Sequence, residues 1–229
     1  MKNKLFNTGF TLAEVLITLG IIGVVAAMTI PTLMAKIREH QTVSILKETY
    51  SILSQGLKLL DEQDEGKPEE WGITGNNKES AEIIGEKFKK VLKIAVDCGT
   101  TNERNCIYKG KYKYLSDFKE PVSYADKDTN YKLILMNGST IMLFGDNGTN
   151  KTVKFLVDTN GASPPNTWGM DLFEIDYTSK YSGLYLDGNK NSGTPYDHPT
   201  SGCAKTGWGC AYYVVTFGNM KYLNKKWFL

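Results

Sequence analysis

The sequence is poor in the residues from which many enzyme and nucleic-acid sites are built. Only two of its 229 residues are histidine, which argues against a histidine-rich metal site or a histidine-based catalytic triad. Lys and Arg number 27 and Asp and Glu 25, so the net charge of +2 gives no electrostatic basis for binding a nucleic acid. The G-x-S-x-G, H-E-x-x-H and G-x-x-x-x-G-K-[ST] motifs are all absent. We therefore expect neither catalysis nor a nucleic-acid partner.

Cysteine is also scarce, with four residues that fall into two local pairs, Cys98 with Cys106 and Cys203 with Cys210. Neither pair has the C-x-x-C spacing of zinc or thioredoxin-like sites. In a protein that leaves the cytoplasm, an even number of cysteines indicates disulfides, here Cys98–Cys106 and Cys203–Cys210, although four cysteines allow three connectivities. Four reduced, buried thiols would instead fit a cytosolic protein.

What the sequence does contain is one long apolar run near its N-terminus. Phe10–Met34 exceeds the roughly 20 residues that a helix needs to cross a bilayer core, and Glu14 is its only ionisable residue. In a secretory signal peptide the cleavage site follows a shorter apolar region, and Ala26-Ala27-Met28 imitates such a site. Here the small residue Gly9 precedes the run, so a cut after Gly9 would leave the whole apolar helix on the mature chain.

Glu14 needs a physical reason, because a charge at the centre of a membrane helix costs about 2.5–3.5 kcal/mol. After a cut behind Gly9, the new N-terminus at Phe10 would carry a positive charge. Where such helices pack side by side, Glu14 of one can pair with the Phe10 amine of its neighbour, which offsets much of the desolvation cost. A Glu near a helix end can also snorkel to the membrane interface, and the chemistry alone does not separate these two roles.

The stretch G-F-T-L-A-E at Gly9–Glu14, leading directly into the apolar run, resembles the class III signal of type IV pilins and type II secretion pseudopilins. In that family a prepilin peptidase cuts after the Gly and N-methylates the new first residue, which implies Gly9 and Phe10 as the processing residues. The family's assembly positions fall on Glu14 and on Pro31, and the resemblance implies that the helix around Pro31 can extend when the subunit is packed into a filament. Pro31 would equally give a kink that any membrane helix tolerates.

The resemblance implies a structural subunit of a type II secretion pseudopilus or a type IV pilus. Its implied partners are other pilin or pseudopilin subunits, in a homo- or hetero-polymer, the prepilin peptidase and an inner-membrane assembly platform. The chain would cross the bacterial inner membrane once, with its head in the periplasm, and end in a periplasmic or extracellular filament. Two alternatives are a minor tip pilin that acts as an adhesin or binds a substrate or DNA, and a membrane-anchored periplasmic domain that never polymerises.

Residue patterns and the resemblance together predict an α+β fold, the pilin-like lollipop of a long N-terminal helix packed on an antiparallel sheet. We expect a leader at residues 1–9, a transmembrane and assembly helix at 10–34, its amphipathic continuation at 35–60 and a globular head at 61–229. The continuation carries a single helical stripe of apolar residues. The stripe comprises Val43, Leu46, Tyr50, Leu53, Leu57 and Leu60.

Within the head we expect a helix over Ser80–Ile94, capped by Ser80, and a hairpin over Tyr131–Gly145 that turns at Asn137-Gly138. Further strands are expected at Val153–Val157, Phe173–Tyr177 and Leu184–Leu186. The last 20 residues fit either a strand, by their β-branched and aromatic content, or a helix that stops at Gly218. The aromatic residues there can form core packing or a contact surface for a neighbouring subunit or a sugar.

One loop of the head offers oxygen ligands for a cation. Asp158, Asn160 and Asp171 lie in D-T-N-G-A-S-P-P-N-T-W-G-M-D, whose opening resembles a calcium loop. Gly169 stands where such a loop has its twelfth-position Glu. Some major pseudopilins bind calcium in a loop after the sheet, so we consider calcium as a possible cofactor, with a plain Asx-turn as the alternative.

Overall fold

The computed structural model describes residues 10–116, 120–146, 153–181, 183–189 and 202–223. The expected leader at residues 1–9, including the processing residue Gly9, lies outside these described residues. The chain divides into two compact units, an N-terminal unit that ends at His40 and a C-terminal unit, Gln41–Leu229. The domain boundaries expected at residues 34 and 60 stay predictions.

Helix α1, Leu12–Glu62, supplies almost all of the described N-terminal unit and continues into the C-terminal unit. It is α-helical through Pro31, which has no N–H to give to the carbonyl oxygen four residues earlier. Its first half is long and apolar enough to cross a membrane, and none of the residues in that apolar window is buried. A helix that is apolar on every side needs a cover of lipid or of other helices.

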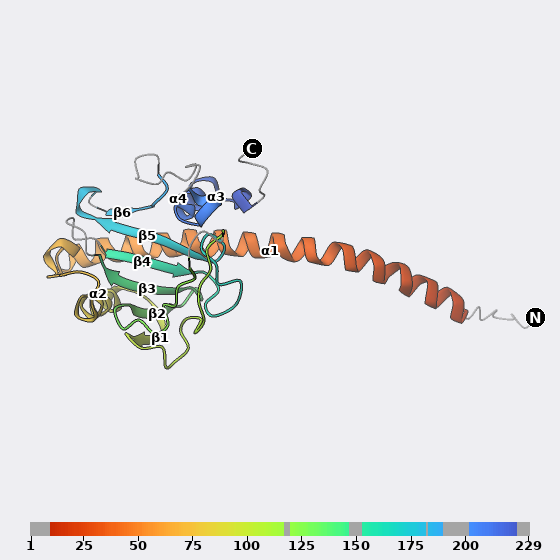
Figure 1. Ribbon diagram of the computed structural model, residues 1–229, viewed down its shortest axis with the longest axis horizontal. Coiled ribbons are helices and arrows are strands. Elements are labelled where there is room, and N and C mark those ends of the chain that lie inside the picture. The colour runs from red at the N-terminus through yellow and green to blue at the C-terminus, as the bar shows by residue number, and fades with distance from the viewer. Residues whose placement is uncertain (1–9, 117–119, 147–152, 182, 190–201, 224–229) are drawn as a thin grey trace, which may run out of the picture. The chain divides into compact units, whose positions relative to one another are not determined.

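The C-terminal unit is built on an antiparallel sheet in which each described strand pairs with the next along the chain (Figure 1). Its strands are β1 (Ile94–Gly99), β2 (Tyr131–Leu135), β3 (Thr140–Gly145), β4 (Val153–Asp158), β5 (Leu172–Thr178) and β6 (Gly183–Tyr185). The β2–β3 hairpin turns at Asn137-Gly138 as expected, and Gly138 adopts the left-handed conformation with φ +87°. A long N-terminal helix followed by an antiparallel sheet confirms the α+β class.

One face of the sheet carries the larger hydrophobic core. The end of α1 and helix α2, Lys78–Val91, both contribute to this core, and the stripe residues Leu46, Leu53 and Leu60 are fully buried in it. Phe88 of α2 meets Phe155 of β4 edge to face, with ring centroids 5.3 Å apart. Helix α2 approaches the sheet so closely at Gly85 that a Cβ there would lie 2.2 Å from the ring of Tyr131.

The opposite face of the sheet is covered by loops. Met142 and Leu156 point to this side, and the long β1–β2 and β4–β5 connections bring Tyr112, Tyr124 and Trp168 against them. Because side chains alternate along a strand, the neighbouring odd-numbered positions of the same strands belong to the first core. The sheet therefore has two covered faces, and each has its own hydrophobic cluster.

The structure corrects the expected helix over Ser80–Ile94. Helix α2 begins at Lys78, and its cap is Asn77, whose side chain accepts a hydrogen bond of 2.8 Å from the Ser80 backbone N–H. The helix ends at Val91, and Ile94 begins strand β1, which the sequence patterns did not indicate. Strand β1 is short and is stabilised by its pairing with β2. Its six residues carry no local pattern that predicts this pairing.

The C-terminal stretch is helical where the structure describes it. Short helix α3, Cys203–Thr206, precedes α4, Cys210–Phe217, which ends at Gly218 in the left-handed conformation, φ +67°. Tyr213 and Val214 of α4 are buried in the first core, so tertiary packing overrides their strand propensity. The described residues also form three 3₁₀ turns, at Pro68–Glu70, Ser179–Tyr181 and Lys221–Leu223.

Candidate functional site at the start of the apolar helix

Two of the expected processing and assembly residues, Phe10 and Glu14, lie at the start of α1. Phe10 is the first described residue, and 89% of its surface is exposed. Thr11 precedes the helix and bonds Glu14 in both directions. The Thr11 backbone N–H donates to Glu14 Oε2 over 2.8 Å, the Thr11 hydroxyl donates to the same oxygen over 2.7 Å, and the Glu14 backbone N–H donates to Thr11 Oγ1 over 3.2 Å.

This arrangement is a capping box, in which Thr11 is the N-cap and Glu14 the third helical residue. The T-x-x-E spacing is the local sequence signal for such a cap, and it gives Glu14 a role inside its own chain in addition to the expected contact with a neighbour. Among the described residues only Oε2 of Glu14 takes part in these bonds, so Oε1 can still accept from a further donor.

Beyond this turn the helix presents a continuous apolar surface. Large side chains from Leu12 to Ile37 are at least 40% exposed, among them Leu16, Ile22 and Ile30. Two of its hydroxyl groups bond within the helix, because Thr18 donates to the Val15 carbonyl and Thr29 to the Val25 carbonyl, each over 2.9 Å. The helix therefore has the surface of a segment buried in lipid or among similar helices.

Two disulfides brace the C-terminal unit, between Cys98 and Cys106 and between Cys203 and Cys210. Their Cα atoms lie 6.4 Å and 4.6 Å apart, within the usual range of disulfide spacing. The first closes the loop after β1, and the second joins α3 to the start of α4. The chain contains no free cysteine among the residues described.

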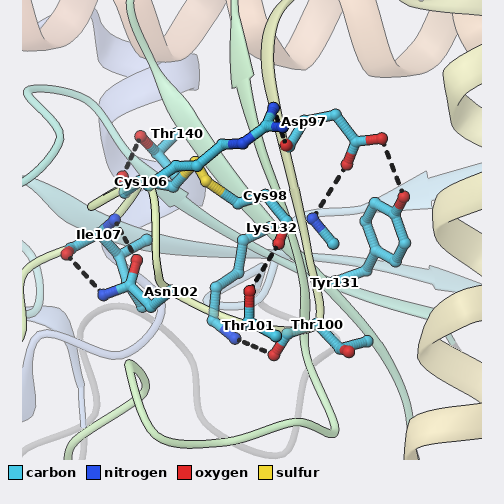
Figure 2. The surroundings of a disulfide bond; sticks show 12 residues. Asp97, Cys98, Thr100, Thr101, Asn102, Cys106, Ile107, Tyr131, Lys132 and Thr140 are labelled. Atoms are coloured by element: carbon cyan, nitrogen blue, oxygen red, sulfur yellow. Dashed lines mark hydrogen bonds between the residues drawn. A yellow bond between two sulfur atoms is a disulfide. The ribbon is translucent and has the colours of Figure 1, made fainter.

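The loop closed by Cys98 and Cys106 is held by polar contacts from several directions (Figure 2). The Thr140 hydroxyl donates to the Cys106 carbonyl over 2.9 Å, and Asn102 bonds both backbone groups of Ile107. Lys132 is fully buried, and its Nζ donates to the carbonyl oxygens of Thr100, Lys127 and Asn130 at 2.9, 2.8 and 3.2 Å. Burial lowers the pKa of Lys132 to about 8.

The structure brings Asp158 and Asp171 together at the junction of β4 and β5. Both are buried, and their oxygens already accept hydrogen bonds: Asp158 from the Tyr112 hydroxyl over 2.5 Å, Asp171 from the backbone N–H groups of Asn166 and Thr167 over 2.6 and 2.7 Å. Burial raises the pKa of Asp171 to about 6, and burial together with the nearby Asp171 raises that of Asp158.

Asn160 lies beside both carboxylates, because its backbone N–H donates to Asp158 Oδ1 over 3.2 Å and its side chain lowers the pKa of Asp171. Its Nδ2 also donates to the Pro164 carbonyl over 3.1 Å. Within the described ranges no group of three or more His, Cys, Asp or Glu is arranged to hold a metal ion. The loop has the Asx-type contacts of the alternative interpretation, and calcium binding stays a prediction.

Comparison with known proteins finds a signal at the N-terminus. Residues 6–30 match the family model of the prokaryotic N-terminal methylation motif, a range that holds Gly9, Phe10 and Glu14 and stops just before Pro31. No curated protein and no solved structure matches the chain. The matched range coincides with the capped start and the exposed apolar half of α1. The chain thus carries the N-terminal methylation motif that is the signature of prepilin-type proteins, the type IV pilins and pseudopilins.

Proposed function

We propose that the chain is a structural subunit of a type IV pilus or a type II secretion pseudopilus, cut after Gly9 and polymerised through α1. The observation that carries this proposal is the methylation motif at residues 6–30, which lies on an exposed apolar helix. The role is assembly, and we propose no catalytic activity.

The exposed helix supports two successive states of the subunit. Before assembly, lipid covers the apolar side chains of residues 12–37 in the inner membrane. After assembly, the same side chains pack against the helices of neighbouring subunits, so the filament replaces one apolar environment with another. Little free energy separates the two environments for the apolar surface itself, and specific polar contacts must therefore fix the arrangement of the subunits.

Glu14 is the residue that can supply such a contact. It is the third residue of α1, in the first turn, close to where the new Phe10 amine would lie after processing. In the proposed filament Glu14 accepts from the Phe10 amine of an adjacent subunit, and both charges leave the lipid as a pair. The capping bonds to Thr11 hold the carboxylate in place before that partner arrives.

The two disulfides support a C-terminal unit outside the cytoplasm, because reducing conditions in the cytoplasm keep thiols reduced. We place this unit in the periplasm, with α1 crossing the inner membrane once. The proposed partners are other pilin or pseudopilin subunits, the prepilin peptidase and the assembly platform of the inner membrane.

The test is the N-terminus of the protein purified from its native membrane, determined by intact mass and terminal sequencing. The proposal expects a chain that starts at N-methylated Phe10. A chain that starts at Met1, or after Ala27 as in a cleaved signal peptide, would contradict processing as a prepilin and with it the assembly role of α1.

A further inference from the structure

A second feature of the C-terminal unit has no part in the proposed assembly. The loop-covered face of the sheet contains an open pocket of 370 Å³, within the roughly 300–1,000 Å³ of ligand pockets. Its lining includes Tyr114, Trp168 and Trp208 from the loops, Lys154 and Glu174 from β4 and β5, and Asp187 beyond β6.

Two of the three aromatic rings are parallel, and the third is perpendicular to both. Tyr114 and Trp168 are parallel, with an interplanar angle of 8° and centroids 6.1 Å apart. Trp208 is perpendicular to both, at 89° to Tyr114 and 84° to Trp168. Trp168 is 2% exposed, whereas Tyr114 and Trp208, which also line the pocket, are half-buried.

The polar groups of the pocket are of both kinds, donors and acceptors. Lys154 is paired with Glu174, and its Nζ also lies 3.6 Å from Asp176. Burial disfavours the charged form of Lys154, but the attraction of the two acids is larger and raises its pKa, so the ammonium stays charged. The indole N–H of Trp168 is buried beside the Tyr124 hydroxyl, so it belongs to the wall of the pocket.

The aromatic rings and charged groups of the lining favour one class of ligand over two others. An anionic ligand would meet Glu174 and Asp187, which outnumber Lys154 in the lining. A quaternary ammonium could lie against the rings, but it offers no acceptor to the Lys154 ammonium. A sugar ring has an apolar C–H face for an aromatic ring, and hydroxyl groups that both donate and accept at its edge.

We propose that this pocket binds a neutral sugar residue, whose C–H face packs on the half-buried ring of Trp208 or Tyr114. Its hydroxyl groups bond the Lys154–Glu174 pair, donating to the Glu174 carboxylate and accepting from the Lys154 ammonium. The binding site belongs to a single C-terminal unit and does not depend on cleavage after Gly9 or on polymerisation.

The experiment uses the full chain in nanodiscs of phosphatidylethanolamine and phosphatidylglycerol, whose head groups carry neither a sugar nor a quaternary ammonium. Maltotriose, cellotriose and triacetylchitotriose are titrated separately, and binding is followed by calorimetry and tryptophan fluorescence. We expect at least one of them to bind with a Kd of about 1 mM or below. Choline chloride is titrated in parallel as the cationic probe.

Variants then locate the site. Trp208→Ala is expected to weaken sugar binding at least about tenfold, and Trp208→Phe, which keeps a ring, to restore most of it. Phe217→Ala is the matched control, because this ring is 48% exposed and lies outside the pocket lining. Tyr114→Ala tests the second ring if the first variant fails to fold, as judged by its melting curve.

Three results would overturn the proposal. The first is that none of the three sugars binds to the wild-type chain. The second is that a sugar binds equally well to folded Trp208→Ala and Tyr114→Ala variants. The third is that choline binds and displaces the sugar, which would make the pocket a cation site.

Discussion

The capping box gives a way to separate the two roles of Glu14, one inside its own chain and one between subunits. Glu14→Gln keeps a side-chain oxygen that can accept from the Thr11 N–H, since Gln serves in a capping box as Glu does. It removes the negative charge that the proposed pairing with the Phe10 amine requires. Thr11→Ala does the opposite, because it removes the N-cap hydroxyl and leaves the charge of Glu14 in place.

The free energy of the helix cap is smaller than that of the charge pair, so the variants can separate the two roles. Loss of an N-cap costs about 0.5–2 kcal/mol and frays one helical turn. A charge pair 4 Å apart is worth up to about 4 kcal/mol at an effective dielectric constant of 20, and breaking it leaves the Phe10 amine without a partner in an apolar filament core. We therefore expect Glu14→Gln and Glu14→Ala to abolish incorporation into filaments, and Thr11→Ala to reduce it only slightly.

The assay measures the fraction of each variant recovered in sheared or isolated filaments, with membrane insertion and N-terminal mass determined in parallel. Removal of the charge makes insertion into the bilayer more favourable, so both Glu14 variants should reach the membrane. Only variants that are inserted and correctly cut are compared. Wild-type incorporation of Glu14→Gln would refute the pairing and leave Glu14 as a helix cap.

Four further predictions concern the C-terminal unit, and thermal or denaturant unfolding of the full chain in nanodiscs measures each of them. Replacing Cys98 and Cys106 by Ser should lower the free energy of unfolding by about 2–3 kcal/mol for so short a loop, and reductant should then have a smaller effect than on the wild type. Asp171 has a folded-state pKa of about 6, above its unfolded value, so its stabilising contribution is complete below about pH 4 and is lost as the pH rises through 6. Millimolar calcium should restore stability at pH 7 if the calcium hypothesis holds, and an unchanged melting temperature there would contradict it. Gly85→Ala should destabilise by about 1–3 kcal/mol because its Cβ would overlap the Tyr131 ring, and a gain in stability would show that α2 can shift.

The N-terminal part of the chain could be predicted from sequence because its signals are local. An apolar run of sufficient length, a small residue before it and one acid near its start all lie within about 25 neighbouring residues. The amphipathic stripe that follows is also a local pattern, and Leu46, Leu53 and Leu60 are buried as that pattern requires.

The head was predictable only where one segment carries its own signal. The Asn137-Gly138 turn and the largely apolar strands on either side of it are such a segment, and the structure has the hairpin there. Strand β1 depends instead on its pairing with β2, and its residues are interrupted by two irregularities in that pairing. Helix α4 combines β-branched and aromatic residues, which favour a strand, with a Gly that suits the end of a helix. Because these local preferences conflict, packing in the core decides its conformation.

The aromatic pocket was beyond prediction for a related reason. Tyr114, Trp168 and Trp208 are separated by at least 40 residues, and only the folded connections place their rings together. The charged residues come from the sheet, where Lys154 is paired in register with Asp176, and Glu174 with Leu156. Slipping β4 by one residue would send Lys154 to the helix-covered face and Phe155 to the pocket. The alternation of side chains along β4 therefore places Phe155 against α2 and Lys154 beside the aromatic rings. The hydrophobic core behind the sheet thus sets the position of the charged groups in the proposed sugar site.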